Sequence, residues 1–165
     1  MFKEGLARFA TEKFQANQLG NKFMHLTNYS INKKNIKFSK NKDLNDDDTG
    51  HKWSLTAFNE YMRSRSHDVK AIWKSIYDVI IKSLIAGETH IVNAMRRTVP
   101  HSSNCFELFG YDILLDENLK PWIMEINLSP SLSCDTPLDF IIKSTMIVDL
   151  FNLLGFQKFD RRKEA

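Results

Sequence analysis

Residues 120–132, KPWIMEINLSPSL, decide how the rest of the sequence is interpreted. The alternation of side chains along this stretch predicts a β-strand. One face of the strand is apolar and carries Trp122, Met124 and Ile126. The opposite face carries a carboxylate and an amide, Glu125 and Asn127, just before a Ser-Pro turn. Because an unpaired carboxylate is costly to bury among large apolar residues, this pair requires a cation or an exposed cleft.

A second strand precedes this one and is expected to pair with it. Residues 105–127, CFELFGYDILLDENLKPWIMEIN, contain two predicted strands around the turn DENL, and so short a connection predicts an antiparallel hairpin. One face of the first strand would carry Phe106, Leu108, Asp112 and Leu114. A turn centred near Glu117 and Asn118 brings Asp112 within about one residue of Glu125. A slip of one residue would reverse the face, so the sequence alone leaves the register open.

Asp112, Glu125 and Asn127 would form an oxygen-rich cluster on the two strands. Oxygen ligands suit hard cations, and a site that combines few protein carboxylates with substrate phosphates suits Mg²⁺. The alternative is that Asp112 and Glu125 are edge charges on a solvated face. Spacing alone leaves both interpretations open.

A second polar group, His25, Thr27 and Asn28, lies in an apolar setting nearer the N-terminus. A structural histidine followed by two turn residues that bond the local backbone explains it as well as a binding site does. Arg8, in EGLAR, is compatible with a surface arginine and with a bidentate grip on carboxylate or phosphate. No phosphate loop of the GxxxxGK type occurs, so a nucleotide would need another architecture to hold it.

The remaining sequence predicts an α/β protein of the α+β kind, with a mainly antiparallel sheet flanked by helices. A short strand is expected over residues 2–10, and a short strand or a passage from strand to loop over residues 24–31. The Asn-, Lys- and Asp-rich residues 32–52 are expected to form an exposed loop. Helices are predicted over residues 53–65, 68–86, 89–97 and 136–156. Ser54 is the expected N-cap of the first, Pro100 ends or follows the third, and Gly155 is the expected stop of the last.

The second of these helices has an apolar stripe expected to pack in the core, formed by Val69, Ile72, Trp73, Ile76, Val79, Ile80 and Leu84. The final residues, 157–165, form a charged tail.

Composition sets broad limits on the function. The 165 residues are 42% hydrophobic and 26% charged, as in a soluble globular domain with its own core. We see neither a membrane span nor a secretory signal, and the two cysteines, Cys105 and Cys134, favour reduced thiols in a cytosolic protein. The formal charge of +3 permits an acidic partner without demanding one, and we expect neither nucleic acid nor membrane as a partner.

Two stretches, KFMHLTNYSINKKN (residues 22–35) and CFELFGYDILLDENLKPWIMEINLSPSL (residues 105–132), together resemble the tubulin tyrosine ligase-like family. KEGLAR at residues 3–8 is similar to the family's REGLAR, and the motifs occur in family order from about Glu4 to Phe156. The polyglutamylase branch is the most similar, and the glycylase and tyrosine-ligase branches are less so.

The resemblance implies an ATP-grasp fold, of which residues 1–156 would be the C-terminal part. It implies an enzyme that uses ATP and Mg²⁺ to join free glutamate to glutamate side chains in the tails of tubulin, through an acyl phosphate. Mg²⁺ and arginine would offset the repulsion between the reacting anions. A cytoplasmic, cytoskeletal location follows, including the cilium, flagellum or basal body.

The resemblance also implies roles for single residues. Asp112, Glu125 and Asn127 match the family's Mg²⁺ ligands, and Asp112 counts with the nucleotide-binding residues as well. The nucleotide-contacting segment matches His25, Leu26, Thr27 and Asn28. Met124 matches an apolar residue of the adenine pocket. Arg8 matches an arginine near the reacting phosphate, and Arg8 and Glu125 are the expected catalytic residues.

This sequence departs from the family in length. Family members have a longer catalytic module, whose other parts supply the lysines that hold the α- and β-phosphates. We therefore expect this chain to hold the metal-binding half of the site, with a strand edge left open, and to be incomplete for catalysis by itself.

Two other functions stay open. The first is a non-catalytic module that binds tubulin or microtubules through the basic clusters at residues 33–34 and 161–163. The second is a ligase that acts on another acidic protein. The preference for α- or β-tubulin, and for initiation or elongation, is not encoded in any motif we can interpret, and Lys143 is compatible with substrate contact and with a solvated helix position.

Overall fold

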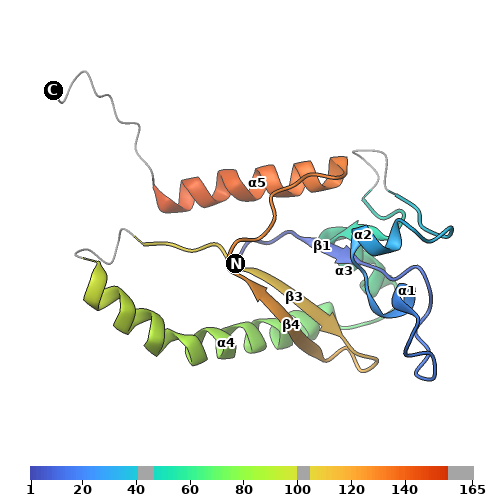
Figure 1. The fold of residues 1–165 in the computed structure, drawn as a ribbon, viewed down its shortest axis with the longest axis horizontal. Helices are drawn as coiled ribbons and strands as arrows, with labels where there is room; N and C mark the ends of the chain where they lie inside the picture. The colour runs from blue at the N-terminus through green and yellow to red at the C-terminus, as the bar shows by residue number, and fades with distance from the viewer. Residues whose placement is uncertain (41–46, 100–104, 156–165) are drawn as a thin grey trace, which may run out of the picture. The chain divides into compact units, whose positions relative to one another are not determined.

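The computed structural model describes residues 1–40, 47–99 and 105–155, and it combines helices with short antiparallel strands (Figure 1). The strands are β1 (Leu6–Arg8), β2 (Lys52–Ser54), β3 (Gly110–Leu115) and β4 (Pro121–Asn127). The helices are α1 (Lys22–His25), α2 (Tyr29–Asn32), α3 (Leu55–Ser64), α4 (Val69–Thr98) and α5 (Pro137–Leu154). Within the described ranges β1 pairs with β2 and β3 with β4, both antiparallel. The predicted mixture of helices and antiparallel strands is confirmed.

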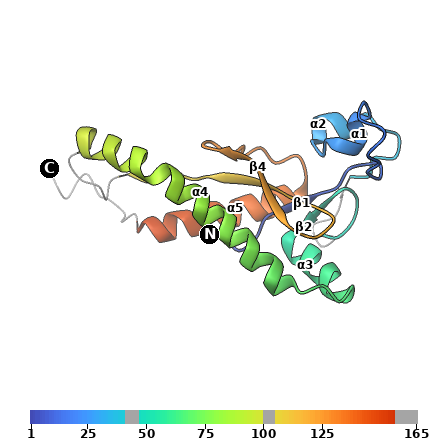
Figure 2. The same cartoon turned by 90° about the horizontal axis from the view of Figure 1, so that it is seen from below.

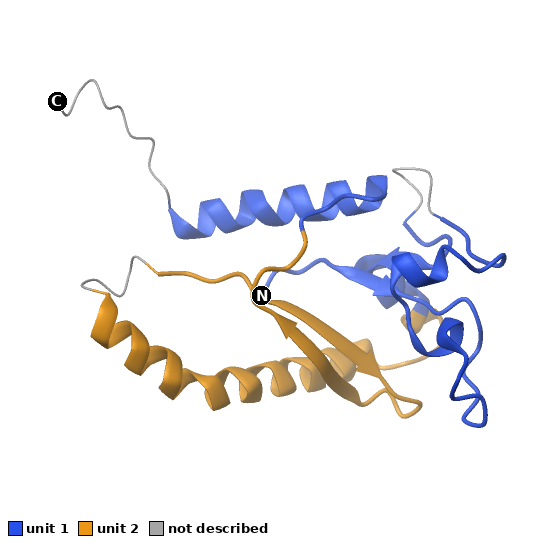
Figure 3. Ribbon diagram, viewed as in Figure 1, with its two compact units in different colours: residues 1–61, 132–165 blue, residues 62–131 orange. Residues whose placement is uncertain are grey.

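The chain divides into two compact units, residues 1–61 with 132–165 and residues 62–131 (Figure 3). The first unit holds the β1–β2 pair, α1, α2, the start of α3, and α5. The predicted Ser54 N-cap is confirmed, because its hydroxyl accepts a hydrogen bond from Ala57 N at 2.9 Å. The Glu4 carboxylate also accepts from Leu55 N at 2.8 Å, so the first turn of α3 is capped twice.

Helix α5 has a defined signal at each end. Thr136 and Asp139 form a capping box, and Pro137 occupies the first turn. Gly155 ends the helix in the left-handed region with φ 65°, as its predicted role as a stop signal requires. The expected last residue of this helix, Phe156, and the tail at residues 157–165 lie outside the described residues.

In the second unit α4 lies against β4, as Figures 1 and 2 show. The prediction of two helices, residues 68–86 and 89–97, is wrong: one helix of 30 residues runs through Gly87. A single interior glycine costs only about 1 kcal/mol, which the helix-favouring residues around it offset. Asp68 caps the start, accepting from Ala71 N at 3.0 Å, and Pro100 lies outside the described residues.

The expected core stripe of α4 is confirmed in its first part only. Val69, Ile72 and Ile76 are buried. Leu84, however, is 43% exposed. Ile85 and Ile91, further along the helix, are 68% and 49% exposed. The stripe has the period of a helix, but periodicity alone does not tell how far along a helix its packing partner extends.

Two predictions for the N-terminal region are wrong. Residues 24–31 form no strand: residues 24–25 end α1, residues 26–28 link the two helices, and residues 29–31 belong to α2. Residues 32–52 are not an exposed loop throughout. Asn32 is 1% exposed and Lys52 belongs to β2, while residues 41–46 lie outside the description. Local asparagine hydrogen bonds outweigh the β-propensity of this apolar stretch.

Candidate functional site

The β3–β4 hairpin forms the first part of the candidate site. Asp112 lies directly opposite Glu125, so the predicted proximity is confirmed and the register left open by the sequence is settled. Side chains directly opposite each other share one face of an antiparallel pair. Asn127 lies opposite Gly110, and its Nδ2 donates to Glu125 Oε1 at 2.9 Å. The three oxygen-bearing side chains therefore gather at one end of one face.

A β-bulge in β4 changes which residues share this face. Ile113 pairs with Ile123, whereas Asp112 pairs with Glu125, so Met124 is the extra residue. Trp122 lies opposite Leu114, which shares a face with Asp112. The prediction that Trp122 lies on the face opposite to Glu125 is therefore wrong. The extra residue shifts the alternation by one, and regular alternation cannot foresee it.

The other face of the hairpin packs toward α4. Tyr111 Oη and Ser83 Oγ are 2.9 Å apart, and this contact links β3 to the helix. On β3 the exposure alternates, with Asp112 and Leu114 exposed and their neighbours half-buried. The predicted strand position of Phe106 and Leu108 is not confirmed, because β3 begins at Gly110. A Cβ at Gly110 would lie 2.8 Å from Pro130 Cβ, so glycine allows the Ser-Pro turn to fold back beside Asn127.

The turn of the hairpin is built on Asp116, which sequence reasoning did not single out. Its Oδ1 accepts from Asn118 N at 2.9 Å and from Lys120 N at 3.0 Å, while its Oδ2 accepts from Trp122 Nε1 at 2.9 Å. The tryptophan hydrogen bond and those from the two backbone amides lower the pKa of Asp116. Lys120 Nζ lies 4.1 Å from the centre of the Trp122 ring. An aspartate at the first position of a four-residue turn is the signal that could have revealed this role.

The predicted nucleotide segment, His25 to Asn28, joins α1 to α2. His25 Nε2 lies 3.0 Å from Gln18 O, and its ring meets Phe14 edge-on with the centroids 5.6 Å apart. Leu26 is 43% exposed, Thr27 is half-buried and Asn28 is exposed. Asn28 makes no side-chain cap, but its carbonyl accepts from Asn32 N at 2.9 Å. The histidine thus has a structural contact, while residues 26–28 remain accessible.

Arg8 ends β1 and lies opposite Lys52 in the strand pair. Its side chain is exposed, and it makes no hydrogen bond or ion pair that the described ranges of the chain show. Lys52, by contrast, pairs with Asp139, its Nζ lying 3.0 and 2.9 Å from the two carboxylate oxygens. Burial raises the pKa of Asp139, but the hydrogen bonds from Lys52 and Thr136 outweigh it, and the net pKa is lowered. The pair ties β2 to the start of α5.

The predicted site residues fall into two groups. Asp112, Met124, Glu125 and Asn127 belong to residues 62–131, whereas Arg8 and His25 to Asn28 belong to the other unit. Met124 is 64% exposed beside the acidic end of the hairpin.

The side-chain oxygen atoms of the hairpin are of the type that a magnesium ion prefers as ligands. They are two carboxylates and an amide whose Nδ2 donates to Glu125, an orientation that leaves Asn127 Oδ1 as the ligand atom. Among the described residues no three of His, Cys, Asp and Glu gather closely enough to hold a metal by themselves. A cation at this hairpin would therefore complete its shell with Asn127, water and substrate oxygens.

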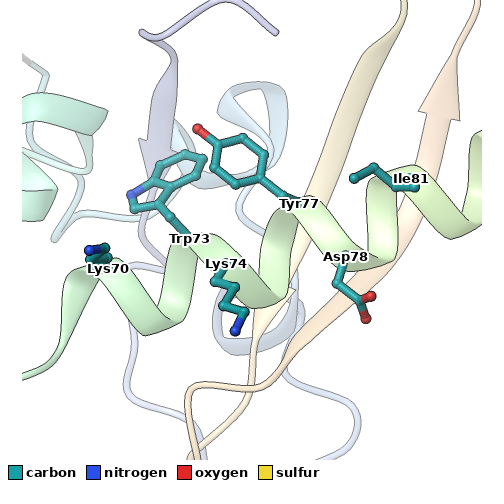
Figure 4. A pocket seen from close by; sticks show the side chains of 6 residues that line it. All are labelled: Lys70, Trp73, Lys74, Tyr77, Asp78 and Ile81. Carbon is teal, nitrogen blue, oxygen red and sulfur yellow. The ribbon is translucent and has the colours of Figure 1, made fainter.

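A shallow hollow of about 470 Å³ lies elsewhere in the second unit, along α4 (Figure 4). Its lining is formed by Lys70, Trp73, Lys74, Tyr77, Asp78 and Ile81. Because all six belong to one helix, they form an open strip and cannot enclose a nucleotide. No candidate site residue contributes to it.

Lys143 makes a structural contact, and both cysteines are free thiols. Lys143 Nζ donates to Ser133 O, so this lysine fastens the loop before α5 and is only half-exposed. Cys105 and Cys134 are exposed free thiols, as expected for a chain without disulfides. No helix in the described ranges is long and apolar enough to cross a membrane.

Comparison with known proteins decides the family. The profile of the Tubulin-tyrosine ligase family matches residues 1–163. The chain belongs to this family. Within the tubulin-tyrosine ligase family it is 48% identical to human tubulin polyglutamylase TTLL5 over 167 residues, which is 100% of this chain and 13% of the relative. Mouse tubulin monoglutamylase TTLL4 is 48% identical over 158 residues, 94% of this chain and 13% of that protein.

A ciliate protein extends the similarity. The probable beta-tubulin polyglutamylase of Tetrahymena thermophila is 43% identical over 161 residues, 94% of this chain and 14% of its own length. The resemblance inferred from HLTNYS, FELFGYD and EINLSPSL is therefore confirmed. This tubulin-tyrosine ligase family chain spans about an eighth of the length of these curated relatives.

Proposed function

We propose that this chain supplies the metal-binding half of an ATP-dependent ligase that adds glutamate to glutamate side chains of tubulin tails. Relatives named as tubulin polyglutamylases and monoglutamylases support it. The observation that carries it is the hairpin on which Asp112 faces Glu125 and Asn127 hydrogen-bonds the same carboxylate. In this proposal residues 1–156 are the C-terminal part of an ATP-grasp catalytic domain, residues 157–165 are a tail, and the enzyme works at the cytoskeleton, including cilia, flagella and basal bodies.

The reaction joins a carboxylate to an amine in two steps. An oxygen of the acceptor glutamate carboxylate attacks the γ-phosphorus of ATP, ADP leaves, and an acyl phosphate forms. The amine of free glutamate then attacks the acyl carbon, phosphate leaves with the bonding electron pair, and the amine loses a proton. Both steps bring anions together, so positioning and charge stabilisation are what the protein must supply.

The residues of this chain fit that requirement. Asp112, Glu125 and Asn127 would hold Mg²⁺, which when bound supplies positive charge to the phosphate oxygens. Arg8, exposed at the end of β1, is able to grip a phosphate or carboxylate with two parallel hydrogen bonds. The accessible residues 26–28 would contact the nucleotide, with His25 holding their start, and Met124 would line the adenine pocket. No nucleophilic side chain is needed.

Glu125→Gln tests the metal-binding role. Glutamine keeps the oxygen that accepts from Asn127 Nδ2 and removes only the negative charge, so the hairpin should remain folded. In the full-length protein, incorporation of labelled glutamate into tubulin with ATP and Mg²⁺ should fall by at least about 10²-fold. The matched control is Glu117→Gln, an exposed carboxylate in the turn of the same hairpin, which should leave incorporation unchanged. Full activity in Glu125→Gln would refute the assignment.

A second candidate function is tubulin binding without catalysis. Around the ring of Tyr29 lie three ammonium groups, those of Lys33 at 5.4 Å, Lys40 at 5.7 Å and Lys52 at 5.9 Å from its centroid. Of the three, only Lys52 forms an ion pair within the described ranges. The other predicted basic cluster, residues 161–163, lies outside the description. The measurement is co-sedimentation with microtubules before and after tail cleavage: binding that needs the tails and weakens with salt favours this function, and equal pelleting contradicts it.

A further inference from the structure

We propose that Asn32 is a positioning residue that fixes the backbone of the nucleotide-contacting segment, residues 26–28, and ties it to the strand that carries Arg8. The inference rests on the proposed function, because it assumes that residues 26–28 contact ATP. Asn32 is itself 1% exposed and would not touch the nucleotide.

All the hydrogen-bonding capacity of the Asn32 amide is used. Oδ1 accepts from Thr11 N at 3.2 Å and from Thr11 Oγ1 at 2.9 Å. Nδ2 donates to Leu26 O at 2.5 Å and to Asn28 O at 3.2 Å. An asparagine side chain has two donor hydrogens and one carbonyl oxygen with two lone pairs, so no capacity is left over.

The orientation of this amide is unambiguous. Thr11 N is a donor only, so the oxygen of Asn32 must face it. The two main-chain carbonyls, Leu26 O and Asn28 O, are acceptors only, so the NH₂ group must face them. Asparagine alone among the small side chains presents two donors and a double acceptor from one position, which explains a polar residue at this depth.

The contacts show what Asn32 positions. Its two donor hydrogens hold the carbonyls on either side of Thr27, turning both inward. The side chains of Leu26 and Asn28 remain exposed on the outside. Thr11, three residues beyond Arg8, is held by the other end of the same amide and reaches Phe23 O at 3.5 Å. One buried side chain thus couples the segment at residues 26–28 to the chain that leaves β1.

Asn32→Ala should therefore change nucleotide affinity, a readout that loss of stability alone does not move. In the full-length protein, below the unfolding transition, the KM for ATP should rise by about tenfold or more, within the roughly 10²-fold that a 1 Å misplacement can cost. The KM for glutamate should stay within about twofold of the wild-type value. Asn17→Ala, at an exposed asparagine of the same unit, is the matched control and should change neither constant.

A softer variant covers the case in which Asn32→Ala fails to fold. Thr11→Val removes the hydroxyl and keeps the Thr11 N hydrogen bond, and it should raise the KM for ATP by a smaller factor, while Thr11→Ser should restore it. A fall in kcat with an unchanged KM for ATP, in whichever variant folds, would overturn the inference while leaving the proposed function intact. A wild-type protein whose glutamate incorporation does not depend on ATP would overturn the proposed function and this inference with it.

Discussion

Replacing Lys52 with methionine should destabilise the protein through Asp139. The Asp139 side chain is 2% exposed and that of Lys52 is 14% exposed, so the substitution leaves a buried carboxylate without its cation. Removing one partner of a buried pair typically costs about 3–5 kcal/mol. Asp139 keeps hydrogen bonds from Asp135 N, Thr136 N and Thr136 Oγ1, which places the expected loss near 3 kcal/mol, the low end of that range.

The loss of stability in Lys52→Met should depend on pH in a defined direction. In the wild-type protein the pKa of Asp139 is lowered, so its contribution to stability is present above its ordinary pKa and is lost as the pH falls through the lowered value. In Lys52→Met, the hydrogen bond and the charge of Lys52 no longer lower the pKa of Asp139, so this pKa should rise. The variant would then favour the protonated carboxyl, and its deficit relative to the wild type should shrink as the pH is lowered from 7 towards the acid range.

Urea unfolding followed by circular dichroism at a series of pH values measures this difference. The matched control is Lys82→Met, which removes the lysine of an exposed pair with Asp78 in which the side chains are 71% and 55% exposed. That change should cost no more than about 0.5 kcal/mol. If Lys52→Met costs as little as Lys82→Met, or if its deficit does not change with pH, the assignment of a buried, charged Asp139 is refuted.

Three further changes test local features. Ser54→Ala removes the cap on Ala57 N and should cost about 1–2 kcal/mol in a urea melt; a loss below about 0.3 kcal/mol would mean that Glu4 suffices. Gly155→Ala places a Cβ on a residue whose φ is 65° and should lower the free energy of unfolding by about 1 kcal/mol; unchanged stability would contradict this expectation. Trp122→Phe removes the Nε1 hydrogen bond, so the pKa of Asp116 should rise toward its ordinary value in an NMR titration; an unmoved titration would contradict the contact.

Where local chemistry decides the structure, the sequence predicted it. Ser54 before an apolar helix and Gly155 at the end of another satisfy helix termini with atoms only a few residues away, as predicted. The capping box of Thr136 and Asp139 is equally local, although it was not among the predictions. The four-residue turn of the hairpin likewise fixed the pairing of Asp112 with Glu125 to within a residue. These features needed no knowledge of the rest of the chain.

Where distant partners decide the structure, the sequence failed. In place of the strand expected over residues 24–31, two short helices flank a link at residues 26–28. Asn32 bonds the carbonyls at 26 and 28 and is itself held by Thr11, 21 residues away. Nothing in the pattern of apolar residues signals that contact. The buried partner of Lys52 lies 87 residues away, and for the same reason a lysine at the end of a polar segment was expected to be solvated.

The bulge at Met124 changes which side chains share a face with the candidate site. Regular alternation would place Glu125 and Trp122 on opposite faces, and the extra residue places them on the same one. The face that carries Asp112 and Glu125 therefore also carries the Trp122 indole, which Asp116 and Lys120 hold at the turn.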